Sequence, residues 1–376
     1  MSDDSIPWLR DNTVLLTVAG SMAYGTYTAQ SDVDLKGVAI PPLQYFIGMG
    51  PNFRFADKPL HIEKFREDLK PEFRARADRT KLEGSIYDLR EFLRLASDCN
   101  PNILDVLFCR DEEVVLATSI GQELRTHRKM FLSRVARYRF AGYALSQLRR
   151  IMGHHEWLEN PPQAEPNRSA FGLKPKPEIP SDQLHAVMAQ VRKQLDRWSS
   201  GFVDDLDEHA KARVKEGIAQ FLAELRIGSD TRFIAAARTL GFDENFIEYL
   251  KKEREFEAAV KRWKSYLDWK KNRNPERAAL EARYGYDTKH AMHLVRLMDQ
   301  GRQVLTRGDL DVWTTDRKRL MAVRNGEWEY QALVDWAERE DLEHIALLET
   351  SPLPEAPNRK KIDALCQDMI RRHLRI

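Results

Sequence analysis

The chain has 376 residues, of which 42% are apolar and 31% charged, and its formal net charge is +2. This composition is typical of a soluble globular protein, long for one domain and sufficient for two. No apolar run approaches the ~20 residues that a membrane-spanning helix needs, and a net charge so near zero does not indicate nucleic-acid binding by itself.

Two further features concern the cellular compartment. The N-terminal sequence MSDDSIPWLRDN lacks the basic and apolar regions of a signal peptide, so we expect a cytoplasmic protein without membrane contact. Cys99, Cys109 and Cys366 are widely spaced and form no CxxC pair. They indicate neither a disulfide framework nor a zinc site, and we expect them to be buried.

The first 118 residues contain short apolar runs that are typical of strands. Strands are predicted over residues 14–19, 32–40 and 114–117, and weaker patterns indicate strands near 53–55, 61–65 and 73–83. One or two helical turns are expected within 21–27 and a short helix from residue 43. Apolar residues at spacings of three and four predict a helix over 86–96, and a second short helix is expected over 103–108.

Beyond about residue 118, the periodicity is helical throughout. Helices are predicted over residues 130–153, 183–198, 205–226, 230–239, 244–271, 286–306, 315–324, 329–349 and 359–374. Residues 160–180 hold six prolines, so we expect a lid, a binding loop or a linker there. The sequence therefore predicts an α+β protein, with a small mixed-sheet domain over 1–118 and a larger all-helical domain over 119–376.

The segment between the first two strands carries the most distinctive chemistry. Gly20 lets the backbone approach a phosphate closely, and Ser21 offers a hydroxyl at the start of a helical turn. Asp32 and Asp34 should point to one side of their strand, because side chains alternate along a strand. Two like charges on one face repel each other unless a cation neutralises them, so we predict a divalent-metal site for a nucleotide. Tyr24 fits either this site or the core.

This segment resembles the DNA-polymerase-beta-like nucleotidyltransferases. The shared pattern is GSMAYGT at 20–26 followed by SDVDL at 31–35. Within that superfamily, the chain is similar to the nucleotidyltransferases associated with RNA repair and RNA ligases. That closer resemblance extends to YDLREFL at 87–93, NPNI at 100–103, GYA at 142–144, FGL at 171–173 and KHAMHLVRL at 289–297.

The resemblance implies a polymerase-beta-like sheet and a catalytic site with two Mg²⁺ or Mn²⁺ ions held by Asp32, Asp34 and a third carboxylate. Alignment of the 87–92 segment assigns the third position to Glu83, with Asp78 and Asp88 as alternatives. Gly20, Ser21, Tyr24 and Ser31 are expected to bind the nucleotide.

The helical region supplies candidate contacts to phosphate. Lys289, His293 and Arg296 recur at four and three residues, so they share a helical face that suits a triphosphate or an RNA end. Residues 128–150 hold seven Lys and Arg and no Asp or Glu, which suits either RNA binding or a solvated helix face. The RNA-binding candidates in this stretch are Arg137, Arg139, Arg149 and Arg150. His154 and His155 have no evident carboxylate partner, and we expect surface or loop residues.

The sequence thus indicates a metal-dependent nucleotidyltransferase that moves a nucleoside monophosphate from an NTP to a hydroxyl. Family association favours an RNA end of the tRNA type as the acceptor, in RNA repair or processing and in association with an RNA ligase or repair enzyme. A protein hydroxyl (AMPylation) or a small molecule is an alternative acceptor. The alternative from a different class is a non-catalytic RNA-binding subunit of a repair system.

Overall fold

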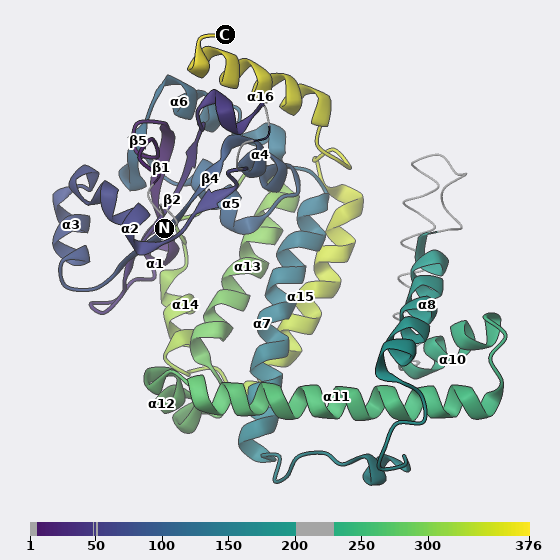
Figure 1. The fold of residues 1–376 in the computed structure, drawn as a ribbon. Coiled ribbons are helices and arrows are strands. Elements are labelled where there is room, and N and C mark those ends of the chain that lie inside the picture. Colours follow the sequence, from purple (N-terminus) through teal and green to yellow (C-terminus); the bar gives the residue numbers. More distant parts are fainter. Residues whose placement is uncertain (1–5, 48, 50–51, 201–228) are drawn as a thin grey trace. The chain divides into compact units, whose positions relative to one another are not determined.

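The computed structural model describes residues 6–47, 49, 52–200 and 229–376 (Figure 1). The chain forms two compact units: Met1–Leu158 with Asn274–Ile376, and Glu159–Arg273. The division therefore differs from the boundary predicted at residue 118, because C-terminal helices share a hydrophobic core with the sheet. No described helix is long and apolar enough to cross a bilayer.

A five-stranded mixed sheet forms the N-terminal part of the first unit, in the order β3-β4-β2-β1-β5. Its strands are β1 (Thr13–Ala19), β2 (Val33–Ala39), β3 (Phe55–Ala56), β4 (Leu82–Asp88) and β5 (Val114–Ala117). β1 is antiparallel to both β2 and β5, whereas β2 and β4 are parallel. The predicted α+β class, with a polymerase-beta-like mixed sheet followed by a helical region, is confirmed.

The two faces of the sheet are covered by different elements, as the alternation along β2 requires. Val33, Leu35 and Ala39 belong to a core shared with α2 (Pro59–Ile62), the turn Glu63–Asp68 and α3 (Pro71–Ala77). Asp34, Lys36 and Val38 alternate with them and face the opposite way. Val38 packs in the larger core with α4 (Leu89–Ser97) and α5 (Pro101–Phe108).

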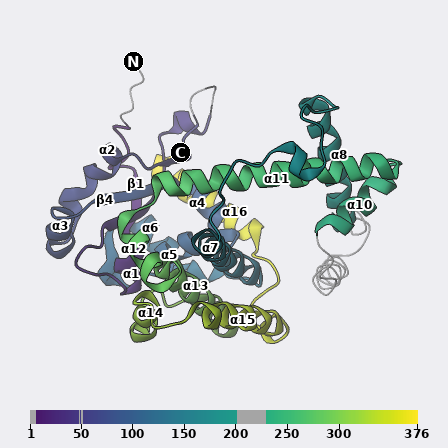
Figure 2. The ribbon, with the colours of Figure 1, turned by 90° about the horizontal axis from the view of Figure 1, so that it is seen from below.

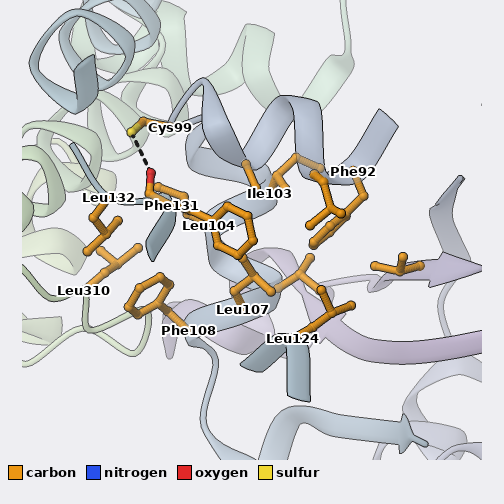
Figure 3. Close-up of a cluster of buried hydrophobic side chains, with 14 of the residues drawn as sticks. Phe92, Cys99, Ile103, Leu104, Leu107, Phe108, Leu124, Phe131, Leu132 and Leu310 are labelled. Carbon is orange, nitrogen blue, oxygen red and sulfur yellow. Dashed lines mark hydrogen bonds between the residues drawn. The ribbon is translucent and has the colours of Figure 1, made fainter. Parts of the chain in front are cut away.

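The larger core joins the sheet to helices from the end of the chain. Figure 3 shows Phe92, Ile103, Leu104 and Phe131 packed together, and the Cys99 Sγ donates a hydrogen bond to the Phe131 carbonyl at 3.3 Å. The same core also contains Met298, Leu310, Leu353, Ile362 and Met369. All three cysteines are buried and unpaired, as predicted.

Long helices complete the first unit. These are α7 (Val135–Glu159), α13 (Thr288–Arg307), α14 (Arg317–Arg324), α15 (Tyr330–Thr350) and α16 (Arg359–Leu374), with the shorter α6 (Ser119–Thr126) and α12 (Pro275–Tyr284). α13 packs against α14 and α15 (Figure 1), and α16 packs against α4. The five helices predicted in these regions are confirmed.

The second unit is helical. It contains α8 (Ser181–Ser200), α10 (Ser229–Thr239) and the long α11 (Glu244–Asn272), with α8 and α10 beside α11 (Figure 2). The helix predicted over 205–226 lies outside the described residues. The proline-rich loop holds a single short turn, Arg168–Phe171. Arg168 donates to the buried Glu253 of α11 at 2.9 Å, so this part of the loop is anchored within its own unit.

Three local predictions were wrong. Residues 61–65 and most of 73–83 were expected as strands, but Pro59 and Pro71 begin short helices there. Residues 86–88 were expected in a helix, yet Ile86 and Tyr87 pair with β2 and Asp88 caps α4. A short apolar segment is compatible with the periodicity of a helix and with that of a strand. Here the pairing with β2 determines that it forms a strand.

Replacing Met369 with alanine is expected to lower the free energy of unfolding of the first unit by ~2–5 kcal/mol, because a cavity is left in the shared core. Met369 is fully buried, whereas Gln367 of the same helix is exposed. Gln367→Ala is therefore the matched control and should change stability by less than ~0.5 kcal/mol. Denaturant unfolding and hydrogen exchange of β1 amides test this. Exchange that rises only in α16 would contradict a shared core.

Candidate functional site

A cavity of about 730 Å³ opens where β2, β4 and α1 (Gly20–Tyr24) meet the helices of the first unit. Its walls come from these three elements, from α5, α7 and α13, and from the segment between β3 and α2. The sheet face that carries Asp34 and Lys36 forms its floor. The cavity therefore collects residues that are far apart in the sequence.

Two carboxylates lie side by side on the floor of the cavity. Asp34 of β2 and Glu83 of β4 are register partners in the parallel pair, and both line the cavity. Asp32 lies at the start of β2, where it is exposed and its Oδ1 accepts a hydrogen bond from the Lys81 backbone N–H at 3.3 Å. The structure thus brings the three predicted carboxylates to one region.

The charged groups around Asp34 have opposite effects on its pKa. Burial raises the pKa of Asp34 above its ordinary value, Lys36 lowers it, and the carboxylates of Glu83 and Asp32 raise it further. Lys289 of α13 also lowers the pKa of Asp34, so this helix brings a positive charge close to the floor. Asp34 therefore stands where an additional cation would favour its ionised form.

The two alternatives for the third carboxylate have other partners. Asp78 forms an exposed ion pair with Arg66 at 2.6 Å. Asp88 is buried, caps α4 by accepting from the Arg90 backbone N–H at 2.6 Å, and also pairs with the Arg90 side chain. Neither residue lines the cavity, so the geometry favours Glu83.

The donor chemistry of this region suits Mg²⁺ or Mn²⁺, which prefer carboxylate oxygens. In the part of the chain that the structure describes, no three His, Cys, Asp or Glu side chains already converge as an ion-binding group. Asp32 and Glu83 are exposed, so their side chains can reorient toward a cation beside Asp34. The residues fit a divalent ion through their chemistry and their shared face.

The turn before α1 is closely fitted to Asp34. Gly20 has a φ of +62° and lines the cavity, and a Cβ at this position would clash with the Asp34 carboxylate. Only glycine satisfies both conditions without strain. Ser21 follows at the start of α1, whereas Ser31 accepts a hydrogen bond from the Thr28 backbone N–H at 2.9 Å and so stabilises the loop. Nucleotide binding by Ser21 and Ser31 stays a prediction.

The residues after α1 are fixed by the chain beyond α13. The Thr314 backbone N–H donates to the Tyr24 carbonyl at 3.1 Å, and Arg317 and Arg324 donate to the carbonyls of Gly25 and Thr26 at 2.7 and 3.2 Å. We call residues 24–26 the clamped loop. Its conformation depends on segments about 290 residues further along the chain.

Tyr24 belongs to a buried polar cluster behind the cavity. Its hydroxyl donates to Asp105 Oδ2 at 2.6 Å, and the Arg296 guanidinium lies 3.7 Å from the ring centroid. Arg296 also lies 3.8 Å from Asp105 Oδ2. Burial raises the pKa of Tyr24, which keeps the hydroxyl protonated and able to donate. Tyr24 packs in the core and also lines the cavity, and its contact with a nucleotide stays a prediction.

Lys36 was not among the predicted site residues. It follows Asp34 by two positions on β2, lines the cavity, and donates to the Asn102 carbonyl at 3.3 Å. Burial lowers the pKa of Lys36, while Asp105 and Asp34 raise it. The period-two alternation that placed Asp32 and Asp34 on one face includes Lys36 as well, so the signal was present in the sequence.

Two of the three residues in the predicted row on α13 line the cavity. These are His293 and Arg296, together with His290, which was not predicted, whereas Lys289 is half-buried and does not line the cavity. Burial lowers the pKa of His293 well below its ordinary value and lowers the pKa of His290 to about 4. Both imidazoles are therefore neutral at physiological pH.

The basic stretch divides into structural and exposed residues. Arg137 is buried and pairs with Asp341 of α15 at 2.9 Å, so its prediction as an RNA-binding residue was wrong. Arg139 is exposed and lies 3.6 Å from Asp98. Arg149 and Arg150 are exposed on α7. A run of charges does not reveal which side of a helix faces the core.

Comparisons with known proteins place part of the chain near a known family. Residues 8–160 match the model of a family described as RlaP, the RNA repair pathway DNA polymerase beta family. An uncharacterized 38.9 kDa protein of the nrdC-mobD intergenic region of Enterobacteria phage T4 is 29% identical over 103 residues, which is 27% of each chain. The match thus spans about a quarter of that relative. No solved structure matches the chain.

Tyr24→Phe is expected to lower the free energy of unfolding by ~1–3 kcal/mol, because the buried Asp105 carboxylate loses its hydroxyl donor. Tyr27→Phe is the matched control, since the contact between Arg76 and the Tyr27 ring does not need the hydroxyl. Thermal and denaturant unfolding of both variants test the prediction. Equal stability of the Tyr24→Phe and original proteins would show that the buried hydrogen bond contributes nothing.

Proposed function

Because residues 8–160 match the model of the RNA repair pathway DNA polymerase beta family, we propose that this protein is a metal-dependent nucleotidyltransferase. It moves a nucleoside monophosphate from an NTP to a hydroxyl of an RNA end, such as that of a tRNA. The observation that carries the proposal is the parallel register of Asp34 with Glu83 beside the Gly20 turn, in one cavity. The match to this family supports the link to RNA repair.

In this proposal, Asp32, Asp34 and Glu83 hold two Mg²⁺ or Mn²⁺ ions. The bound ions supply charge neutralisation for the triphosphate and lower the pKa of the attacking hydroxyl. Asp34 and Glu83 line the cavity, and Asp32 is close enough for its charge to raise the pKa of Asp34. An RNA ligase or another repair enzyme is the expected functional associate.

The residues of the chain position the reactants. The backbone at Gly20 and Ser21 approaches the triphosphate, and Lys36, Lys289 and Arg296 place positive charge around the same region. The acceptor hydroxyl attacks the α-phosphorus, the bond to the pyrophosphate oxygen breaks, and the hydroxyl proton passes to the Glu83 carboxylate. Glu83 suits this role because it is the more exposed carboxylate of the register pair.

The double variant Asp32→Ala/Asp34→Ala is expected to lose label transfer from NTP by at least ~100-fold, because the metal ligands are removed. Each labelled NTP is incubated separately with total tRNA and Mg²⁺ or Mn²⁺. EDTA should abolish transfer by the original protein, and added Mg²⁺ or Mn²⁺ should restore it. Equal transfer by the double variant and the original protein would refute the proposed function.

The fraction that carries the label identifies the acceptor. Label in RNA supports the proposed substrate, whereas label in protein or in a small-molecule fraction points to the alternative acceptors. Isothermal titration of NTP with and without Mg²⁺ addresses the non-catalytic alternative, since a scaffold should show no metal-dependent nucleotide binding.

Glu83→Gln is expected to reduce the rate of transfer by ~10²–10⁴-fold, because the amide neither accepts the proton nor carries the charge that holds the ions. The matched control is Asp78→Asn, which removes a carboxylate outside the cavity and should leave the rate within about twofold. The single-turnover rate at saturating NTP measures the effect. A larger loss in Asp78→Asn than in Glu83→Gln would reverse the assignment.

A further inference from the structure

One face of α7 continues from the cavity toward solvent. Tyr143, Gln147 and Arg150 recur at four and three residues, so they lie on one side of the helix. Tyr143 and Gln147 line the cavity, and Arg150 is exposed. Arg150 lies close enough to His290 for its charge to lower the pKa of that residue, which places it beside the same region of α13.

His290 presents an unused hydrogen-bond donor in this region. Its side chain lines the cavity, only 8% of the residue is exposed, and its Nε2 lies 2.8 Å from Arg277 Nη1. A guanidinium only donates hydrogen bonds, so Nε2 is the acceptor and the proton of the neutral ring is on Nδ1. His290 Nδ1 is buried without a partner among the described residues. Such a donor suits an oxygen of a bound ligand.

Two positively charged side chains lie close to His290. Arg277 of α12 donates to His290 and lies 3.3 Å from Asp287, and Arg150 approaches from α7. The carboxylates of Asp34 and Glu83 and the ammonium of Lys36 line the cavity from the sheet. Tyr143, Gln147 and His290 add uncharged polar groups to the lining, and Arg150 and the Asp287-paired Arg277 bring positive charge close to His290.

This combination of carboxylates, uncharged polar groups and cations suits the end of a polynucleotide. The terminal hydroxyl requires the metal-binding carboxylates, whereas the phosphates behind it require cations. Tyr143 and Arg150 are seven residues apart, which is about 10.5 Å along a helix. The two residues can therefore contact different parts of one bound strand.

We propose that Tyr143, Gln147, His290, Arg150 and Arg277 form a binding surface for the acceptor strand of RNA. This surface rests on the proposed function, because it leads to the same carboxylates. Tyr143, Gln147 and the Nδ1–H of His290 contact the sugar and base of the terminal nucleotides. Arg150 and Arg277 bind a phosphate of the same strand behind the reacting hydroxyl.

The surface also distinguishes two adjacent arginines for which the sequence predicts the same role. Arg149 is exposed like Arg150, but successive residues of a helix point about 100° apart. Only Arg150 continues the face of Tyr143 and Gln147. Arg149→Gln is therefore a matched control for Arg150→Gln, with the same change of charge one position away.

The test measures binding of a fluorescent 12-nucleotide single-stranded RNA to the full chain by anisotropy, across a series of salt concentrations. Arg150→Gln should weaken binding about tenfold and reduce the slope of log K against log[salt] by about 1. Arg150→Lys should restore most of the affinity, because it keeps the positive charge. Arg149→Gln should bind as the original protein does.

The outcomes separate this inference from the proposed function. Equal weakening by Arg149→Gln and Arg150→Gln, or no weakening by either, overturns the binding surface. If the RNA does not bind while label transfer to protein or a small molecule persists, the surface is wrong and the nucleotidyltransferase chemistry stands. If Arg150-dependent RNA binding persists without any label transfer, the proposed chemistry fails instead.

Discussion

The pairing of β2 with β4 is the constraint on which the site depends. Their parallel register sets Asp34 beside Glu83, and the close approach of the strands leaves no room for a side chain at Gly84, whose Cβ would meet the Leu35 carbonyl. Two neighbouring carboxylates with a third at Asp32 repel one another. The positive charges of Lys36 on the same strand and of Lys289 on α13 reduce this repulsion.

The polar groups of the cavity come from two distant parts of the first unit. The sheet provides the carboxylates and Lys36, whereas Lys289, Arg296 and the neutral His290 and His293 come from α13. The same helix contributes Met298 and Val304 to the core that covers the sheet. One element thus serves packing and electrostatics, with its polar residues at the cavity and its apolar residues against the sheet.

The sequence predicts the central strands and the carboxylates well because their signals are local. Buried strands read as short apolar runs, and the spacing of Asp32 and Asp34 fixes their shared face. Residues 86–88 were assigned to a helix because Ile86 fits the periodicity of a helix as well as that of a strand. Only the pairing with β2 shows that these residues belong to a strand. Lys36 was missed although the alternation that selected Asp34 also includes it.

Other parts of the site could not be predicted from the sequence. The cluster of Tyr24, Asp105 and Arg296 joins three distant segments, and no local sequence pattern predicts these contacts. Arg137 resembles its exposed neighbours in sequence, but the packing of α7 against α15 buries it beside Asp341. The division into units likewise depends on which helices share a core, which periodicity does not specify.

The clamped loop has a consequence for the order in which the molecule matures. Residues 24–26 leave the ribosome well before the groups that fix them, which are Thr314, Arg317 and Arg324. The strands can pair while synthesis continues, but the clamped loop acquires these hydrogen bonds only after residue 324 has been made. Until then, the chain carries the carboxylates of β2 and β4 beside a loop that lacks its final support.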